Sequence, residues 1–140
     1  MTNLISNGVK RKIKNEISWK NYLIKAEQFF ETAQEAYNGE NWNAVSLNAV
    51  HSAISANDAI TVYFKRIRSA SEKHSDAVDL LLNVFPNNKE AREFSSHLLW
   101  LLNRKNIVEY EARLFYKKEA EDSIKHAERF LRWAKNHLPK

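Results

Sequence analysis

The sequence contains no cysteine, and only two glycines and two prolines among its 140 residues. Disulfides, thiolate metal sites, iron–sulfur clusters and a cysteine nucleophile are therefore excluded. The scarcity of glycine and proline excludes glycine-rich phosphate-binding loops and argues against a β fold, which needs many turns. No apolar run approaches the roughly 18 residues of a membrane span, and the N-terminus carries no secretory signal. These absences predict a cytoplasmic protein that contacts no membrane.

Charge is unevenly distributed along the chain. Basic residues outnumber acidic ones by 22 to 17, a formal net charge of +5. Residues 1–20 carry five basic side chains and one acidic, a net charge of +4, which leaves residues 21–140 close to neutral at +1. Residues 1–17 also lack sustained helical periodicity, so we interpret them as a basic flexible tail before a single helical domain over 18–140. The tail either aids solubility or contacts phosphate.

From Ser18 onwards, apolar residues recur every three or four positions, which is the spacing of amphipathic helices. A first helix is predicted between Ser18 and Gly39. A second, from Asn41 to about Arg68, is apolar on most of its sides and is expected at the centre of the fold. Further helices are predicted over about 74–85, 89–103 and 109–137. The pattern contains no strand and predicts an all-α, antiparallel up-and-down bundle of four or five helices.

The predicted helices and loops follow one another in a distinctive order. An amphipathic first helix is followed by an alanine-rich central helix, ENWNAVSLNAVHSAISANDAITVYF, and a polar loop with a histidine, RSASEKH. A short apolar helix, AVDLLLNVF, comes next, and the chain closes with RKNIVEYEARLFYKKEAEDSIKHAERFLRWAKNHL. This order resembles the HEPN family of small helical nucleotide-binding domains, over about residues 18–138. The resemblance implies a helical domain that acts as a dimer, beside a nucleotidyltransferase-type partner protein in some settings.

Many members of that family are metal-independent ribonucleases. Their motif is an arginine, four to six further residues and a histidine, often with a tyrosine after it. Here Arg104 matches the arginine and Tyr110 lies close to the expected tyrosine, but Glu109 stands where the histidine belongs. RNA cleavage needs groups that exchange protons near neutral pH, which imidazole does well and an ordinary carboxylate does poorly. We therefore do not expect this chain to have the nuclease activity of the family. Arg104 and Glu109 are candidate catalytic residues only under the alternative that the chain is a nuclease.

The stretch that resembles the motif also holds the predicted ligand site. Arg104 is expected to hold phosphate, and Tyr110 to orient the site or stack on a base. In a dimer, two such basic patches would face each other across a cleft suited to phosphate. The alternative is a solvated surface, because nearby glutamates dilute the positive charge. The predicted nucleotide- or RNA-binding residues are Arg104, Lys105, Asn106, Tyr110, Arg113 and Asp58.

The central helix carries a polar stripe on its otherwise apolar surface, formed by Asn48, His51, Ser55 and Asp58. Spacings of three and four residues place these side chains on one face. The stripe either faces solvent, lines a cleft or packs, hydrogen-bonded, against another helix. His51 and Asp58 are two turns apart, about 10 Å along the helix axis, so direct pairing between them is not expected.

No metal or cofactor site is predicted, because the paired Glu-x-x-His motifs of di-iron bundles and the His-Glu-x-x-His motif are absent. Leu99 and Trp100 lie outside the apolar face of their helix, which suggests a second apolar surface and hence a homodimer.

The leading hypothesis is a dimeric HEPN-like module that binds nucleotide or RNA phosphate without robust catalysis. Two alternatives stay open. One is a ribonuclease toxin of a toxin–antitoxin pair, with Glu109 or His51 replacing the missing histidine, and the other is a structural interaction bundle without a ligand.

Overall fold

The computed structural model describes residues 11–13, 18–70 and 73–140. Within these residues the fold consists of five helices and one two-stranded ribbon. In chain order the elements are β1 (Arg11–Ile13), α2 (Ser18–Asn38), α3 (Trp42–Lys65), β2 (Ile67–Ser69), α4 (His74–Val84), α5 (Lys89–Tyr110) and α6 (Lys117–Asn136). The all-helical bundle predicted from the sequence is confirmed.

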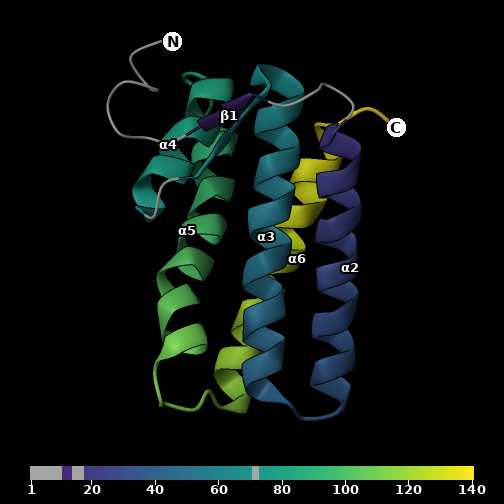
Figure 1. Cartoon of the computed structure of the whole chain (residues 1–140), viewed down its shortest axis with the longest axis vertical. Coiled ribbons are helices and arrows are strands. Elements are labelled where there is room, and N and C mark those ends of the chain that lie inside the picture. The colour runs from purple at the N-terminus through teal and green to yellow at the C-terminus, as the bar shows by residue number, and fades with distance from the viewer. Residues whose placement is uncertain (1–10, 14–17, 71–72) are drawn as a thin grey trace.

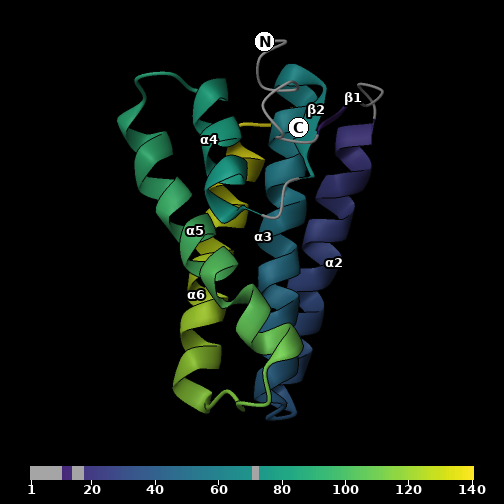
Figure 2. The ribbon, with the colours of Figure 1, turned by 60° about the vertical axis from the view of Figure 1, so that its left-hand side comes forward.

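The four long helices run along the longest axis of the molecule, and the short helix α4 lies beside α5 near one end (Figure 1). In chain order, α2, α3, α5 and α6 alternate in direction. The second view shows α2 on one side of α3 and α5 on the other (Figure 2). Among the described helices, none is both long and apolar enough to cross a membrane.

The core forms around α3, in agreement with its apolar surface. Ala49, Val50, Ala53, Ala56 and Ile60 of this helix are fully buried. Their mostly small side chains let the neighbouring helices approach closely, and the burial of apolar surface stabilises the bundle. Fully buried side chains on those neighbours complete the core: Ala26, Leu81, Leu98, Leu101, Phe130 and Ala134.

The two-stranded ribbon is a feature that the sequence pattern does not predict. The central helix ends at Lys65 rather than near Arg68, because Arg66 adopts a left-handed conformation with a φ of 57° and caps the last turn with its backbone N–H. The next three residues extend as β2 and pair antiparallel with β1. The predicted tail is thus paired at residues 11–13, and its other residues lie outside the described part of the chain.

The helix boundaries around the motif stretch also differ from the prediction. The pattern predicts a break after Asn103 and a last helix from Glu109, whereas α5 continues to Tyr110 and α6 begins at Lys117. No glycine or proline interrupts the stretch, so helical hydrogen bonding continues for two more turns. The start of α6 is fixed instead by Glu119, whose Oε1 accepts the backbone N–H of the residue before the helix at 3.2 Å. The motif stretch therefore lies on the last two turns of α5.

Candidate functional site

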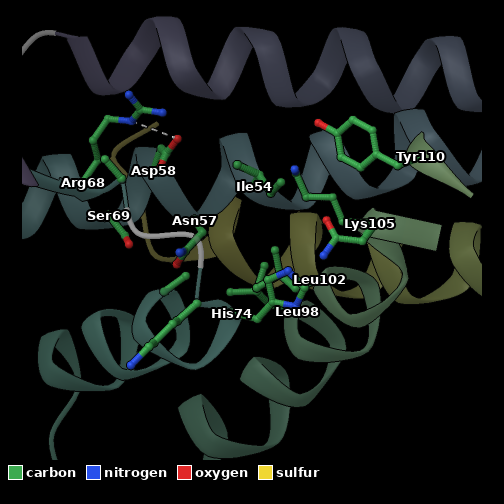
Figure 3. A pocket seen from close by; sticks show the side chains of 14 residues that line it. Ile54, Asn57, Asp58, Arg68, Ser69, His74, Leu98, Leu102, Lys105 and Tyr110 are labelled. Carbon is green, nitrogen blue, oxygen red and sulfur yellow. Dashed lines mark hydrogen bonds and ion pairs between the residues drawn. The ribbon is translucent and has the colours of Figure 1, made fainter. Parts of the chain in front are cut away.

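A cavity of about 700 Å³, called the main cavity below, opens between α3, β2, α4 and α5 (Figure 3). Leu98 and Leu102 of α5 form a buried apolar part of its lining, and the half-buried Ile54 of α3 adds to it. Leu98 is fully buried and Leu102 is 5% exposed, whereas Tyr110 at the outer edge is 76% exposed. The polar side chains of the lining come from all four elements: Asn57, Asp58, Arg68, Ser69, Lys73, His74, Lys105, Asn106 and Tyr110.

Arg68 is held at the edge of the main cavity by Asp58. Its Nε donates to Asp58 Oδ2 at 3.3 Å, and its guanidinium lies 5.5 Å from the centre of the Tyr22 ring. Asp58 is only 5% exposed, and a buried carboxylate is strongly destabilising unless it has a cationic partner. Strand β2 brings Arg68 to this place, since the ribbon register sets it opposite Lys12 of β1.

The polar stripe predicted on α3 lines a cleft for most of its length. His51, Ser55 and Asp58 border a smaller cavity of about 410 Å³ between α2 and α3. This cavity meets the main cavity at the ion pair of Asp58 with Arg68, which lines both. Asn48 does not line it, and its side-chain amide donates to a backbone carbonyl of its own helix at 2.8 Å. His51 and Asp58 have different partners, in keeping with their separation along the helix.

Glu109 contacts two basic side chains beside the main cavity. His51 Nε2 lies 3.1 Å from Glu109 Oε1, and Lys105 Nζ lies 3.4 Å from Glu109 Oε2. The side chain of Glu109 is 14% exposed and that of His51 35%. An imidazole from α3 therefore meets the carboxylate that stands in the histidine position of the motif. Imidazole and carboxylate side chains are the groups that most often act in general acid–base catalysis.

Arg104, the predicted phosphate ligand, does not line the main cavity. Its guanidinium stacks on the ring of Trp100, 3.5 Å from the ring centre, and its Nη1 donates to the Trp100 carbonyl at 3.0 Å. The Trp100 ring stacks in turn on His126 of α6, with the ring centres 4.2 Å apart. Burial lowers the pKa of Arg104, and the carboxylates of Glu119 and Asp122 oppose that shift. The Trp100 ring therefore connects α5 to α6, and Arg104 packs against that ring.

Arg113, another predicted ligand residue, also does not line the main cavity. It lies in the loop between α5 and α6, where its guanidinium makes two hydrogen bonds to the carboxylate of Glu119, at 2.9 and 2.6 Å. The hydrogen bond raises the pKa of Arg113 and lowers the pKa of Glu119. Four of the predicted ligand residues line the main cavity: Asp58, Lys105, Asn106 and Tyr110.

Comparison with known families agrees with this architecture. The sequence matches the family model described as HEPN domain over residues 19–137, which is most of the chain. The chain belongs to the HEPN domain family. HEPN domains are helical and generally related to nucleotides or RNA. No curated protein and no solved structure matches the chain.

Asn57 and Arg68 line the main cavity of this HEPN domain, but neither was among the ligand residues predicted from the sequence. The helical pattern of the sequence places Arg68 at the end of the central helix. It therefore does not indicate that Arg68 lies in a strand beside the cavity. Asn57 lies within the most apolar helix, where a polar residue directly before Asp58 was the available signal. Among the described residues, no three His, Cys, Asp or Glu side chains gather closely enough to hold a metal ion.

Proposed function

We propose that this HEPN domain binds a nucleotide or an RNA segment in the main cavity, without robust catalysis. The observation that carries the proposal is the lining among the residues that the structure describes, which combines apolar side chains with three cationic ones, Arg68, Lys73 and Lys105, and the carboxylate of Asp58. Ligand pockets typically combine apolar walls with a few polar groups and measure roughly 300–1,000 Å³. The volume of about 700 Å³ is therefore suited to a mononucleotide or to one splayed-out nucleotide of RNA.

The side chains at the outer edge of the main cavity have separate roles in this proposal. Lys105 and Arg68 attract phosphate oxygens, and the exposed amide of Asn106 hydrogen-bonds to phosphate or sugar. Tyr110 is exposed enough to stack on a base, a contact that tolerates any sequence. Asp58 acts indirectly, because its carboxylate holds the guanidinium of Arg68 in place.

Fluorescence anisotropy with a labelled single-stranded RNA, and calorimetric titration with AMP, test the proposal. Affinity for RNA should fall steeply with salt, because phosphate contacts release counterions. Lys105→Ala should weaken RNA binding several-fold and reduce the salt slope by about one. Lys125→Ala removes an exposed lysine from α6, outside the main cavity, and is the matched control. Failure of both RNA and AMP to bind at about 50 mM salt refutes the proposal.

A ribonuclease is a second candidate function, and the contact of 3.1 Å between His51 Nε2 and Glu109 Oε1 favours it. In this reading the imidazole of His51 supplies the proton exchange that a carboxylate alone performs poorly. Purified protein should then cleave single-stranded RNA, and His51→Gln should abolish cleavage while His137→Gln leaves it intact. Intact RNA after hours with the unaltered protein removes this candidate, including its toxin–antitoxin form.

We also propose that the domain works as a dimer, on the basis of its family and of exposed apolar side chains near the motif stretch. Leu99, Leu114 and Tyr116 are 36%, 64% and 70% exposed. Light scattering should give twice the chain mass of 16.4 kDa, and a species of 16.4 kDa at high concentration would contradict the dimer. On family grounds, a nucleotidyltransferase-type protein is the proposed partner, and co-purification with such a protein tests it.

A further inference from the structure

Asn57 of α3 carries a buried amide oxygen without a hydrogen-bond partner among the described residues. The residue is 4% exposed, and its Oδ1 accepts no hydrogen bond. Buried polar atoms nearly always have a partner, so this atom requires an explanation. Asn57 lines the main cavity, and Figure 3 shows its side chain in the region bordered by Ser69 and His74. Asn57 therefore places an unpartnered acceptor in the wall of the main cavity.

The apolar part of the lining favours a flat ring system. Ile54, Leu98 and Leu102 give the main cavity an aliphatic wall on which the face of a ring can pack. A ligand that is wholly apolar would leave Asn57 Oδ1 unpaired, at a cost in binding free energy. The ligand that satisfies both features is a flat ring with an N–H donor on its edge.

We propose that Asn57 recognises the amino-bearing edge of adenine and makes the main cavity selective for adenine nucleotides. This inference rests on the nucleotide-binding function proposed above. The adenine N6–H donates to Asn57 Oδ1, while Asn57 Nδ2 donates to the neighbouring ring nitrogen. Asparagine and adenine form this bidentate pair in nucleic-acid recognition, where the two hydrogen-bonding patterns match. The base then packs on the aliphatic wall, and its phosphate lies toward the basic side chains Lys105 and Arg68.

Isothermal titration calorimetry with two ligands tests the assignment. AMP and purine riboside 5′-monophosphate differ only in the amino group, so any difference in affinity reports the contact made by that group. The unaltered protein should bind AMP roughly tenfold more tightly than the analogue. Asn57→Leu replaces the amide with an apolar side chain of similar size and should remove the preference. Asn136→Leu makes the same change on α6, outside the main cavity, and should keep it.

The outcomes separate the inference from the function on which it rests. Equal binding of AMP and purine riboside 5′-monophosphate by the unaltered protein overturns the role of Asn57 and leaves the nucleotide-binding proposal standing. A preference for AMP that persists in Asn57→Leu also overturns it. Failure of both ligands to bind overturns the inference, and the proposed function is overturned with it only if single-stranded RNA also fails to bind. If Asn57→Leu does not fold, Asn57→Ser, which is smaller, provides the same comparison, because its hydroxyl cannot make the bidentate pair.

Discussion

Lowering the pH from 7 to 5 should destabilise the domain through a histidine pair that connects α5 to α6. His97 Nδ1 and His126 Nδ1 lie 2.8 Å apart, and His126 also stacks on Trp100. Burial is the main cause that lowers the pKa of His126 from 6.5 to about 4, with His97 and Arg129 adding to the shift and Asp122 opposing it. Burial likewise lowers the pKa of His97. Protonation of this pair is therefore unfavourable in the folded state.

The sign and size of the effect follow from proton linkage. An unfolded chain has an ordinary histidine pKa of about 6.5, so it takes up the proton before the folded state does as the pH falls. The stabilisation is present above about pH 6.5 and is lost as the pH falls toward the folded pKa of about 4. The full shift would remove about 2 kcal/mol between pH 7 and pH 5. Because His126 is only partly buried, solvent screening reduces this to about 1 kcal/mol, or a Tm lower by about 3–5 °C.

Thermal unfolding followed by circular dichroism at pH 7 and pH 5 measures this loss. His126→Phe keeps an aromatic ring against Trp100 and removes the titrating group, so its Tm should depend less steeply on pH. His74→Phe removes a histidine from α4, away from the pair, and should keep the slope of the unaltered protein. Parallel pH slopes for His126→Phe and the unaltered protein would refute the reasoning.

Three further perturbations give simple readouts. Phe130→Ala, at a fully buried position of α6, should lower the free energy of unfolding by about 3–5 kcal/mol in urea titrations, and a loss below about 1 kcal/mol would contradict a close-packed core. Arg104→Ala should leave RNA affinity unchanged, alter Trp100 fluorescence and lower the free energy of unfolding by about 0.5–1 kcal/mol. A large loss of RNA affinity in this variant would show that Arg104 does contact the ligand. Deletion of residues 1–17 should preserve the helical circular dichroism spectrum, since the core lies within α2 to α6, and an unfolded product would show that the deleted segment is required for folding.

Much of this fold is predictable from the sequence because each helix has its own apolar pattern. The periodicity from Ser18, the stop at Gly39 and the apolar surface around Ala53 follow from local spacing alone. Glu109 and Tyr110 are likewise found from the family resemblance. These features depend on residues that are neighbours in the chain, so one sequence is enough to locate them.

The features that the sequence did not reveal depend on residues that are distant in the chain. Arg68 reaches the main cavity because β2 pairs with β1, a contact between segments more than fifty residues apart. The contact of His51 with Glu109 joins α3 to α5 in the same way. An isolated three-residue strand has no alternation long enough to recognise, and helical periodicity does not say which side chains of two helices meet. The cavity therefore emerges only from tertiary packing.

Helix geometry determines which side chains of α5 face the main cavity. Consecutive residues of an α-helix point about 100° apart, and of Arg104 and Lys105 only Lys105 lines the main cavity. Arg104 packs on Trp100 toward α6, and it would have to leave that ring to reach a ligand near α3. Lys105 points to the other side, where Glu109 follows it by one helical turn and contacts both Lys105 and His51. In this HEPN domain the motif arginine therefore packs on Trp100, while Lys105, Asn106 and Tyr110 line the candidate ligand site.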